Sequence, residues 1–168
     1  VLPDADMDQV IKDLTGAAYG SAGERCMALP VVVPVGQRTA DELRERLVSE
    51  IPNLRVGVST DAEAHYGPVV TQTHKDKVLG WINKGVEEGA ELVVDGREFS
   101  LQGHEKGFFI GPSLFDHVKP EMESYKEEIF GPVLQIMRAA SFEEALSLPS
   151  KHQYGNGVAI FTQNGRAA

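Results

Sequence analysis

Short apolar runs typical of buried strands alternate along this chain with longer segments of helical periodicity. In residues 7–18 the apolar side chains recur every three or four positions, as on one face of a helix. Aspartates lie at the start of this segment, where the positive end of a helix dipole favours negative charge. A β-branched run at 29–36 and a second helical segment at 39–51 follow. This order predicts an α/β domain in layers, with a largely parallel sheet, right-handed crossovers and flanking helices.

The second half of the chain continues the alternation. A helix is predicted over 73–90, with Gly89 where it ends, and another over 141–148. Two predicted capping boxes join Thr39 with Glu42 and Ser141 with Glu144. The apolar runs predicted as strands, the first closed by an Asp-Gly turn, are 90–96, 107–115, 132–139 and 157–162.

Composition limits the classes of function. The chain has 168 residues, 42% of them hydrophobic, which suits one folded unit over residues 1–168. A net charge of −9 leaves no basic face for nucleic acid or an anionic membrane, and no apolar stretch approaches the roughly 20 residues that cross a bilayer. A single cysteine excludes an internal disulfide, which fits a reducing compartment.

Several kinds of site are missing from the sequence. The chain has no glycine-rich dinucleotide fingerprint, no phosphate-binding loop and no serine-hydrolase elbow. The five histidines follow no usual metal-binding spacing, so no metal is predicted. They are His65, His74, His104, His117 and His152.

Cys26, the only cysteine, follows two glycines and an arginine in the stretch YGSAGERCM. Gly20 and Gly23 would let the backbone turn sharply and present the thiol on a loop, and Arg25 would favour the reactive thiolate. The opposite interpretation is buried packing, because free cysteine is among the most buried residue types. Composition alone favours that inert role.

The wider pattern resembles the aldehyde dehydrogenase superfamily. YGSAGERC is similar to its nucleophile segment and KEEIFGPVLQI, residues 126–136, to its second signature, while GFFIGPSL and YGNGVAIFT follow in the family's order. Within it, GERCMALPVVVPVG and YGPVVTQTHKDKV resemble the CoA-acylating branch of methylmalonate-semialdehyde dehydrogenases. The resemblance covers about the whole chain and implies the fold of that family's catalytic domain.

The resemblance implies a role for four residues. Cys26 matches the nucleophile that attacks an aldehyde and carries the resulting thioester, with its own N–H near the oxyanion. Arg25 matches an arginine that pairs with a substrate carboxylate. Glu128 and Phe130 match residues set against the nicotinamide ribose and ring of NAD. The implied reaction converts methylmalonate or malonate semialdehyde to propionyl-CoA or acetyl-CoA with loss of carbon dioxide, with CoA as co-substrate.

The resemblance also implies what surrounds this segment. Residues 1–168 correspond to most of the thiol-bearing catalytic domain, without the NAD-binding Rossmann domain or the C-terminal oligomerisation segment. The chain alone is therefore expected to be inactive. The parent is expected to be a homodimer or homotetramer, cytoplasmic in a bacterium or in the mitochondrial matrix of a eukaryote.

Three alternatives stay open at this point. One is an aldehyde dehydrogenase that releases the acyl group to water instead of CoA. Another is a non-catalytic domain that keeps the fold, which an inaccessible Cys26 would support. The last is a cysteine hydrolase with His65 or His152 as base, which requires a histidine within about 3 Å of the thiol.

Overall fold

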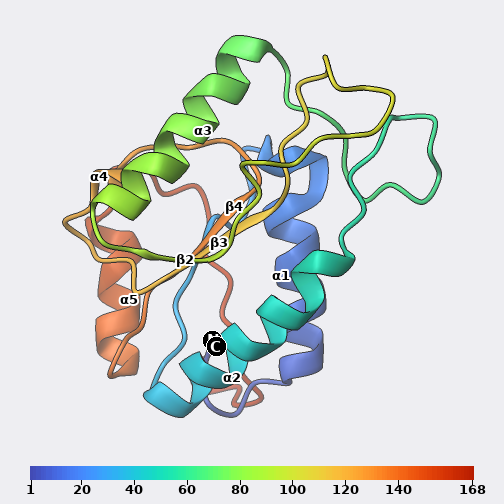
Figure 1. Ribbon diagram of the computed structural model, residues 1–168. Helices are drawn as coiled ribbons and strands as arrows, with labels where there is room; N and C mark the ends of the chain where they lie inside the picture. Colours follow the sequence, from blue (N-terminus) through green and yellow to red (C-terminus); the bar gives the residue numbers. More distant parts are fainter.

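Four strands form one sheet in the computed structural model, which describes residues 1–168 (Figure 1). The strands are β1 (Val31–Val32), β2 (Glu91–Val94), β3 (Ser113–Asp116) and β4 (Val133–Ile136), in the spatial order β1-β4-β3-β2. β4 pairs in parallel with β1 and β3, and only the edge strand β2 is antiparallel. The predicted α/β class with a largely parallel sheet is confirmed.

Helices flank this sheet, and in the view of Figure 1 α3 lies above the strands, α2 below them and α5 to their lower left. The helices are α1 (Met7–Tyr19), α2 (Gln37–Glu50), α3 (Gln72–Glu87), α4 (Glu123–Lys126) and α5 (Phe142–Lys151), with 3₁₀ turns η1 (Gly20–Gly23) and η2 (Ile51–Asn53). None of them combines the length and apolar composition that a bilayer crossing requires. One cluster of 28 buried apolar residues joins helices and strands, so the elements share a single core.

Local residues explain where three helices begin or end. Asp6 caps α1 by accepting the N–H groups of Asp8 and Gln9, and Ser141 caps α5 by accepting the N–H of Glu144. At the end of α3, Gly89 has a φ of +90°, and the hydrogen bond from the N–H of residue 90 to the carbonyl of residue 85 closes a Schellman motif. The predicted end of this helix is confirmed.

The predicted capping box at Thr39 is wrong. The helix begins at Gln37, because Gly36 adopts a φ of +86° and its carbonyl already accepts the first helical hydrogen bond, from Ala40. Thr39 therefore lies inside the first turn, where its side chain is buried. At the other predicted box the Glu144 carboxylate accepts the N–H of residue 140, one residue before the cap.

Two strand predictions also differ from the structure. Residues 157–162 form no strand, because a single backbone hydrogen bond, from Leu2 N–H to the Phe161 carbonyl, joins them to the rest of the chain. Val158 is accordingly 64% exposed. Asp95-Gly96 ends β2 but makes no tight hairpin, since β3 starts only at residue 113 and the extended segment before it packs on Gly96.

A buried ion-pair network lies at the end of β3. The Asp116 side chain is fully buried, and it accepts hydrogen bonds from Arg138 Nε at 3.0 Å and Nη2 at 2.7 Å, with Arg44 Nε 3.2 Å away. Glu91 and His117 place ligand atoms within 4.8 Å of it, but its carboxylate is already shared by two arginines. Burial alone raises the pKa of Asp116, but hydrogen bonds from Arg138 and the His117 N–H outweigh burial and hold this pKa below its ordinary value.

Asp116→Asn is expected to lower the free energy of unfolding by about 2 kcal/mol at pH 7, because two arginines lose their shared carboxylate. The pKa of Asp116 is lower in the folded state than in the unfolded state, where it is about 4. The stabilisation is therefore complete above about pH 4, and it is lost as the pH falls through the folded-state pKa. Urea unfolding from pH 7 downward measures the difference between wild type and variant. Asp95→Asn, in an exposed pair with Arg97, is the matched control and should change little. If the difference in free energy of unfolding between wild type and Asp116→Asn stayed constant with pH, the role assigned to the Asp116 carboxylate would be contradicted.

Candidate active site

Cys26 lies in an exposed turn between η1 and β1. Before it, Ser21, Ala22 and Gly23 have φ angles of 54°, 55° and 72°. Residues other than glycine rarely adopt this left-handed conformation, and it concentrates at functional sites, where the surrounding structure holds it. The thiol is therefore presented on a loop, as Gly20 and Gly23 predicted, and the interpretation as buried packing is wrong.

The turn that carries Cys26 packs directly against the segment that precedes β4. A Cβ atom on Gly23 would overlap the carbonyl oxygen of Gly131, so the two backbones touch where a side chain would separate them. Phe130, beside this contact, is also left-handed, with a φ of 57°. Three of the chain's four non-glycine residues with positive φ thus lie in the two segments that carry the predicted site.

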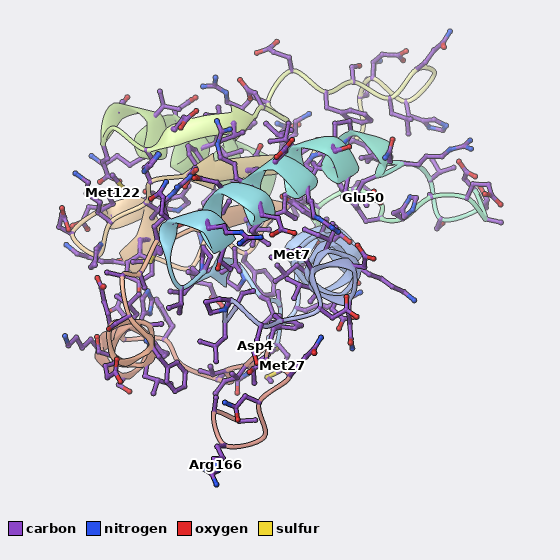
Figure 2. All side chains as sticks on the ribbon, turned by 90° about the horizontal axis from the view of Figure 1, so that it is seen from below. Asp4, Met7, Met27, Glu50, Met122 and Arg166 are labelled. Carbon is purple, nitrogen blue, oxygen red and sulfur yellow. The ribbon has the colours of Figure 1, made fainter.

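A cavity of about 960 Å³ opens beside this contact. All four residues predicted from the sequence line it, namely Arg25, Cys26, Glu128 and Phe130. Residues 155–161, after α5, form another part of the wall, and Asn156 Nδ2 donates to the Cys26 carbonyl at 2.9 Å. Figure 2 shows Met27, the residue after the thiol, on the side from which the C-terminal segment around Arg166 projects.

Arg25 turns back onto α1. Its Nε donates to Ser21 Oγ at 3.2 Å and its Nη1 to the Gly16 carbonyl at 3.3 Å, and its Nη2 packs over Gly20, where a Cβ atom would collide with it. No hydrogen bond joins the guanidinium to the Cys26 sulfur. The side chain is exposed, it lines both this cavity and a second one on the side of Gly16 and Gly20, and its Nη2 donors have no protein partner.

Glu128 and Phe130 belong to the segment before β4, which supplies Gly131 to the contact with Gly23. The Glu128 carboxylate is exposed and makes no hydrogen bond, whereas its backbone carbonyl accepts from Lys77 Nζ at 3.3 Å. The Phe130 ring is half-buried, and its carbonyl lies 2.7 Å from a ring nitrogen of a histidine on α3. Their backbone is therefore held while the carboxylate stays available to a ligand.

The whole chain, residues 1–168, matches the model of the aldehyde dehydrogenase family. The chain belongs to this family. It is 55% identical over its whole length to malonate-semialdehyde dehydrogenase of Pseudomonas aeruginosa and 48% identical to the mitochondrial, acylating methylmalonate-semialdehyde dehydrogenase of Arabidopsis thaliana. It spans 34% and 27% of these two relatives.

Solved structures of aldehyde dehydrogenases agree with this assignment. A protein from Sinorhizobium meliloti assigned to the methylmalonate-semialdehyde dehydrogenases, in complex with NAD, superposes with a TM-score of 0.97 at 58% identity. The match covers 99% of this chain and 34% of that one. The predicted family and its fold are thereby confirmed, over about a third of a family member's length.

Three members of this site were not predicted from the sequence. Glu24 and His74 approach each other to 3.3 Å and bridge the two segments, although 50 positions separate them in the chain. Asn156 lies within YGNG, which carried the family resemblance without a role of its own. All three residues lie in stretches that carried the family resemblance, but none was predicted to have a role, because no local spacing indicates a contact between a loop glutamate and a helix histidine.

No histidine serves the thiol as a base. His152 Nδ1 accepts the Tyr154 N–H at 3.0 Å and its Nε2 lies 2.8 Å from the Tyr125 carbonyl, while His65 Nδ1 accepts a backbone N–H at 2.9 Å. Neither imidazole is hydrogen-bonded to Cys26. The cysteine-hydrolase alternative therefore lacks its base, and the exposed thiol removes the support for a non-catalytic domain.

Proposed function

We propose that this chain supplies the thiol half of an NAD-dependent aldehyde dehydrogenase that oxidises methylmalonate or malonate semialdehyde and transfers the acyl group to CoA. The observation that carries the proposal is the exposed Cys26 in a cavity that Arg25, Glu128 and Phe130 also line. The relatives named for these two semialdehydes, one of them acylating, support the choice of substrate and acceptor.

The turn suits a nucleophile that forms a covalent adduct. The Cys26 thiolate attacks the aldehyde carbon, and the carbonyl oxygen of the resulting thiohemiacetal becomes an oxyanion. The Cys26 N–H makes no hydrogen bond within the chain, so it can donate to that oxyanion. Loss of hydride from the adduct leaves a thioester on Cys26, and attack by the CoA thiol releases the acyl group and regenerates the free cysteine.

Arg25 suits the second end of the substrate. A guanidinium presents a planar fork of donors that matches a carboxylate, and the Nη2 donors of Arg25 have no protein partner. A semialdehyde with a carboxylate beyond its carbonyl group would thus be held at both ends. After thioester formation this carboxylate leaves as carbon dioxide, the electron pair of the broken bond passes into the enolate of the thioester, and a proton from solvent completes the propionyl or acetyl group.

The residues beside the thiol fit one end of NAD, which when bound supplies the hydride acceptor of this reaction. Glu128 offers an unpartnered, exposed carboxylate that can accept two hydrogen bonds from ribose hydroxyl groups. Phe130 offers the edge or face of a half-buried ring at the same cavity wall. These two side chains would orient the cofactor relative to Cys26.

A chimera tests the proposal. These 168 residues would replace the matching third of the P. aeruginosa relative, to which they are 55% identical. With methylmalonate semialdehyde, NAD and CoA, we expect propionyl-CoA and NADH in equal amounts, measured by mass spectrometry and absorbance. Steady-state NADH formation that is unchanged without CoA would instead establish the hydrolytic alternative, and a correctly folded chimera that makes no NADH would refute the proposal.

A further inference from the structure

We propose that His74 is a positioning residue that ties the Cys26 turn to the segment carrying Glu128 and Phe130 through one ring N–H. The inference rests on the proposed function, because it concerns how the nucleophile and the candidate cofactor residues are held together. The contacts themselves are independent of any substrate.

The geometry fixes the proton on His74. Its Nε2 lies 2.7 Å from the Phe130 carbonyl oxygen and 3.3 Å from Glu24 Oε1. A carbonyl oxygen only accepts hydrogen bonds, so Nε2 must carry the hydrogen that it donates to Phe130, and the Glu24 carboxylate contacts the same nitrogen from the other segment. Both side chains are largely buried, with 14% of His74 and 17% of Glu24 exposed, so water competes little for these two contacts.

Glu24 anchors the other end of the bridge. It lies two residues before Cys26, and its Oε1 also accepts the Val70 N–H at 3.2 Å. The histidine ring thus contacts one acceptor from the nucleophile turn and one from the segment before β4. Movement of either segment away from the other breaks either the hydrogen bond to Phe130 or the contact with Glu24, both at the same nitrogen.

One face of α3 seats the segment before β4. His74, Lys77 and Val78 are spaced at i, i+3 and i+4 and therefore point the same way. Lys77 donates to the Glu128 carbonyl, and Val78 packs so tightly on Gly131 that a Cβ there would lie 2.7 Å from its Cγ2. The Thr71 side chain caps this helix by accepting the His74 N–H at 3.1 Å. This hydrogen bond holds the backbone of His74 in the first turn of the helix.

The left-handed backbone conformation of Phe130 needs a contact such as that with His74 to hold it. Its φ of 57° is unfavourable for a residue with a side chain and persists only where surrounding contacts hold it. The hydrogen bond from His74 holds its carbonyl, and the two rings meet edge to face with centroids 6.3 Å apart. His74 therefore sets the direction in which the Phe130 ring enters the cavity.

Nitrogen NMR of the 168-residue chain tests the assigned proton directly. At a pH where histidines are neutral, we expect the His74 ring as the Nε2–H tautomer, identified by the signal that His74→Phe removes. A His74 ring with the hydrogen on Nδ1 would overturn the proposal. A role in packing alone would not select a tautomer.

Hydrogen–deuterium exchange of the same chain tests the tie. In His74→Phe, which keeps a ring but loses the donor, we expect about tenfold faster exchange in residues 20–26 and in 128–131 together. His74→Gln, whose amide N–H₂ can still donate, should stay near wild type, as should the control Thr73→Ala at an exposed neighbouring position without a side-chain hydrogen bond. Unchanged exchange in either segment of His74→Phe would overturn the tie.

The chimera connects the tie to catalysis. We expect His74→Phe to raise KM for NAD about tenfold with kcat changed much less, and His74→Gln to restore it, since misplaced Glu128 and Phe130 weaken binding before they weaken chemistry. A fall in kcat at unchanged KM for NAD would refute the claim that His74 acts on the binding of NAD. If the chimera with His74 intact made no NADH, the proposed function would fail while the NMR and exchange results still decided the positioning role.

Discussion

Cys26→Ala in the chimera is expected to lower kcat for aldehyde oxidation by at least about 10⁴-fold, because loss of a covalent nucleophile removes the whole adduct pathway. The chain holds no second cysteine that could replace it. Hydrogen-bond donors and bound cofactor then have no tetrahedral adduct to stabilise. Steady-state NADH formation measures the loss, and Met27→Leu, a volume-conserving change in the same turn, is the control that should stay close to wild type.

Intact mass provides a second readout for the same prediction. With semialdehyde and NAD present and CoA withheld, the chimera should gain the mass of one propionyl or acetyl group, and Cys26→Ala should gain none. Activity above about a hundredth of wild type in Cys26→Ala, or an adduct that survives the substitution, would show that the thiol is not the nucleophile.

Signals that act within a few residues were readable in the sequence. Asp6 and Ser141 accept N–H groups two and three residues away, and Gly89 ends α3 through its own backbone conformation. Alternation of helical and apolar segments then indicated the α/β class, because each segment must bury one face against another. These features need no knowledge of distant parts of the chain.

Predictions failed where a distant or neighbouring backbone decides the outcome. Thr39 carries a good capping side chain, but the conformation of Gly36 starts the helix before it. Residues 157–162 have the composition of a strand and lack a paired neighbour along their length. Propensity describes what a segment can form, and pairing determines whether it forms.

In the candidate site, too, the sequence predicted residues that short motifs carry and did not predict contacts between distant segments. Cys26, Arg25, Glu128 and Phe130 were found because short motifs carry them, and the structure brings all four to one cavity. The contact of Gly23 with Gly131 joins residues more than 100 positions apart, and the bridge through His74 joins three separate segments. Such contacts follow from the fold and leave no periodic signal.

Gly23→Ala is expected to lower the free energy of unfolding of the 168-residue chain by at least about 3 kcal/mol, through two separate effects. An alanine at a φ of +72° is strained, and its Cβ would overlap the Gly131 carbonyl oxygen, which is backbone and cannot rotate away.

The matched control is Gly80→Ala, the same substitution inside α3, where nothing lies within 4 Å of the added Cβ. There the change should raise the free energy of unfolding by about 0.5–1 kcal/mol, because alanine loses less backbone freedom in a helix than glycine. Urea denaturation measures both variants, and the opposite signs separate a local clash from a general effect of alanine. A loss below about 1 kcal/mol for Gly23→Ala would mean that the Cys26 turn and the segment before β4 can part at little cost. The close packing of the two segments would then not be what holds the thiol beside Phe130.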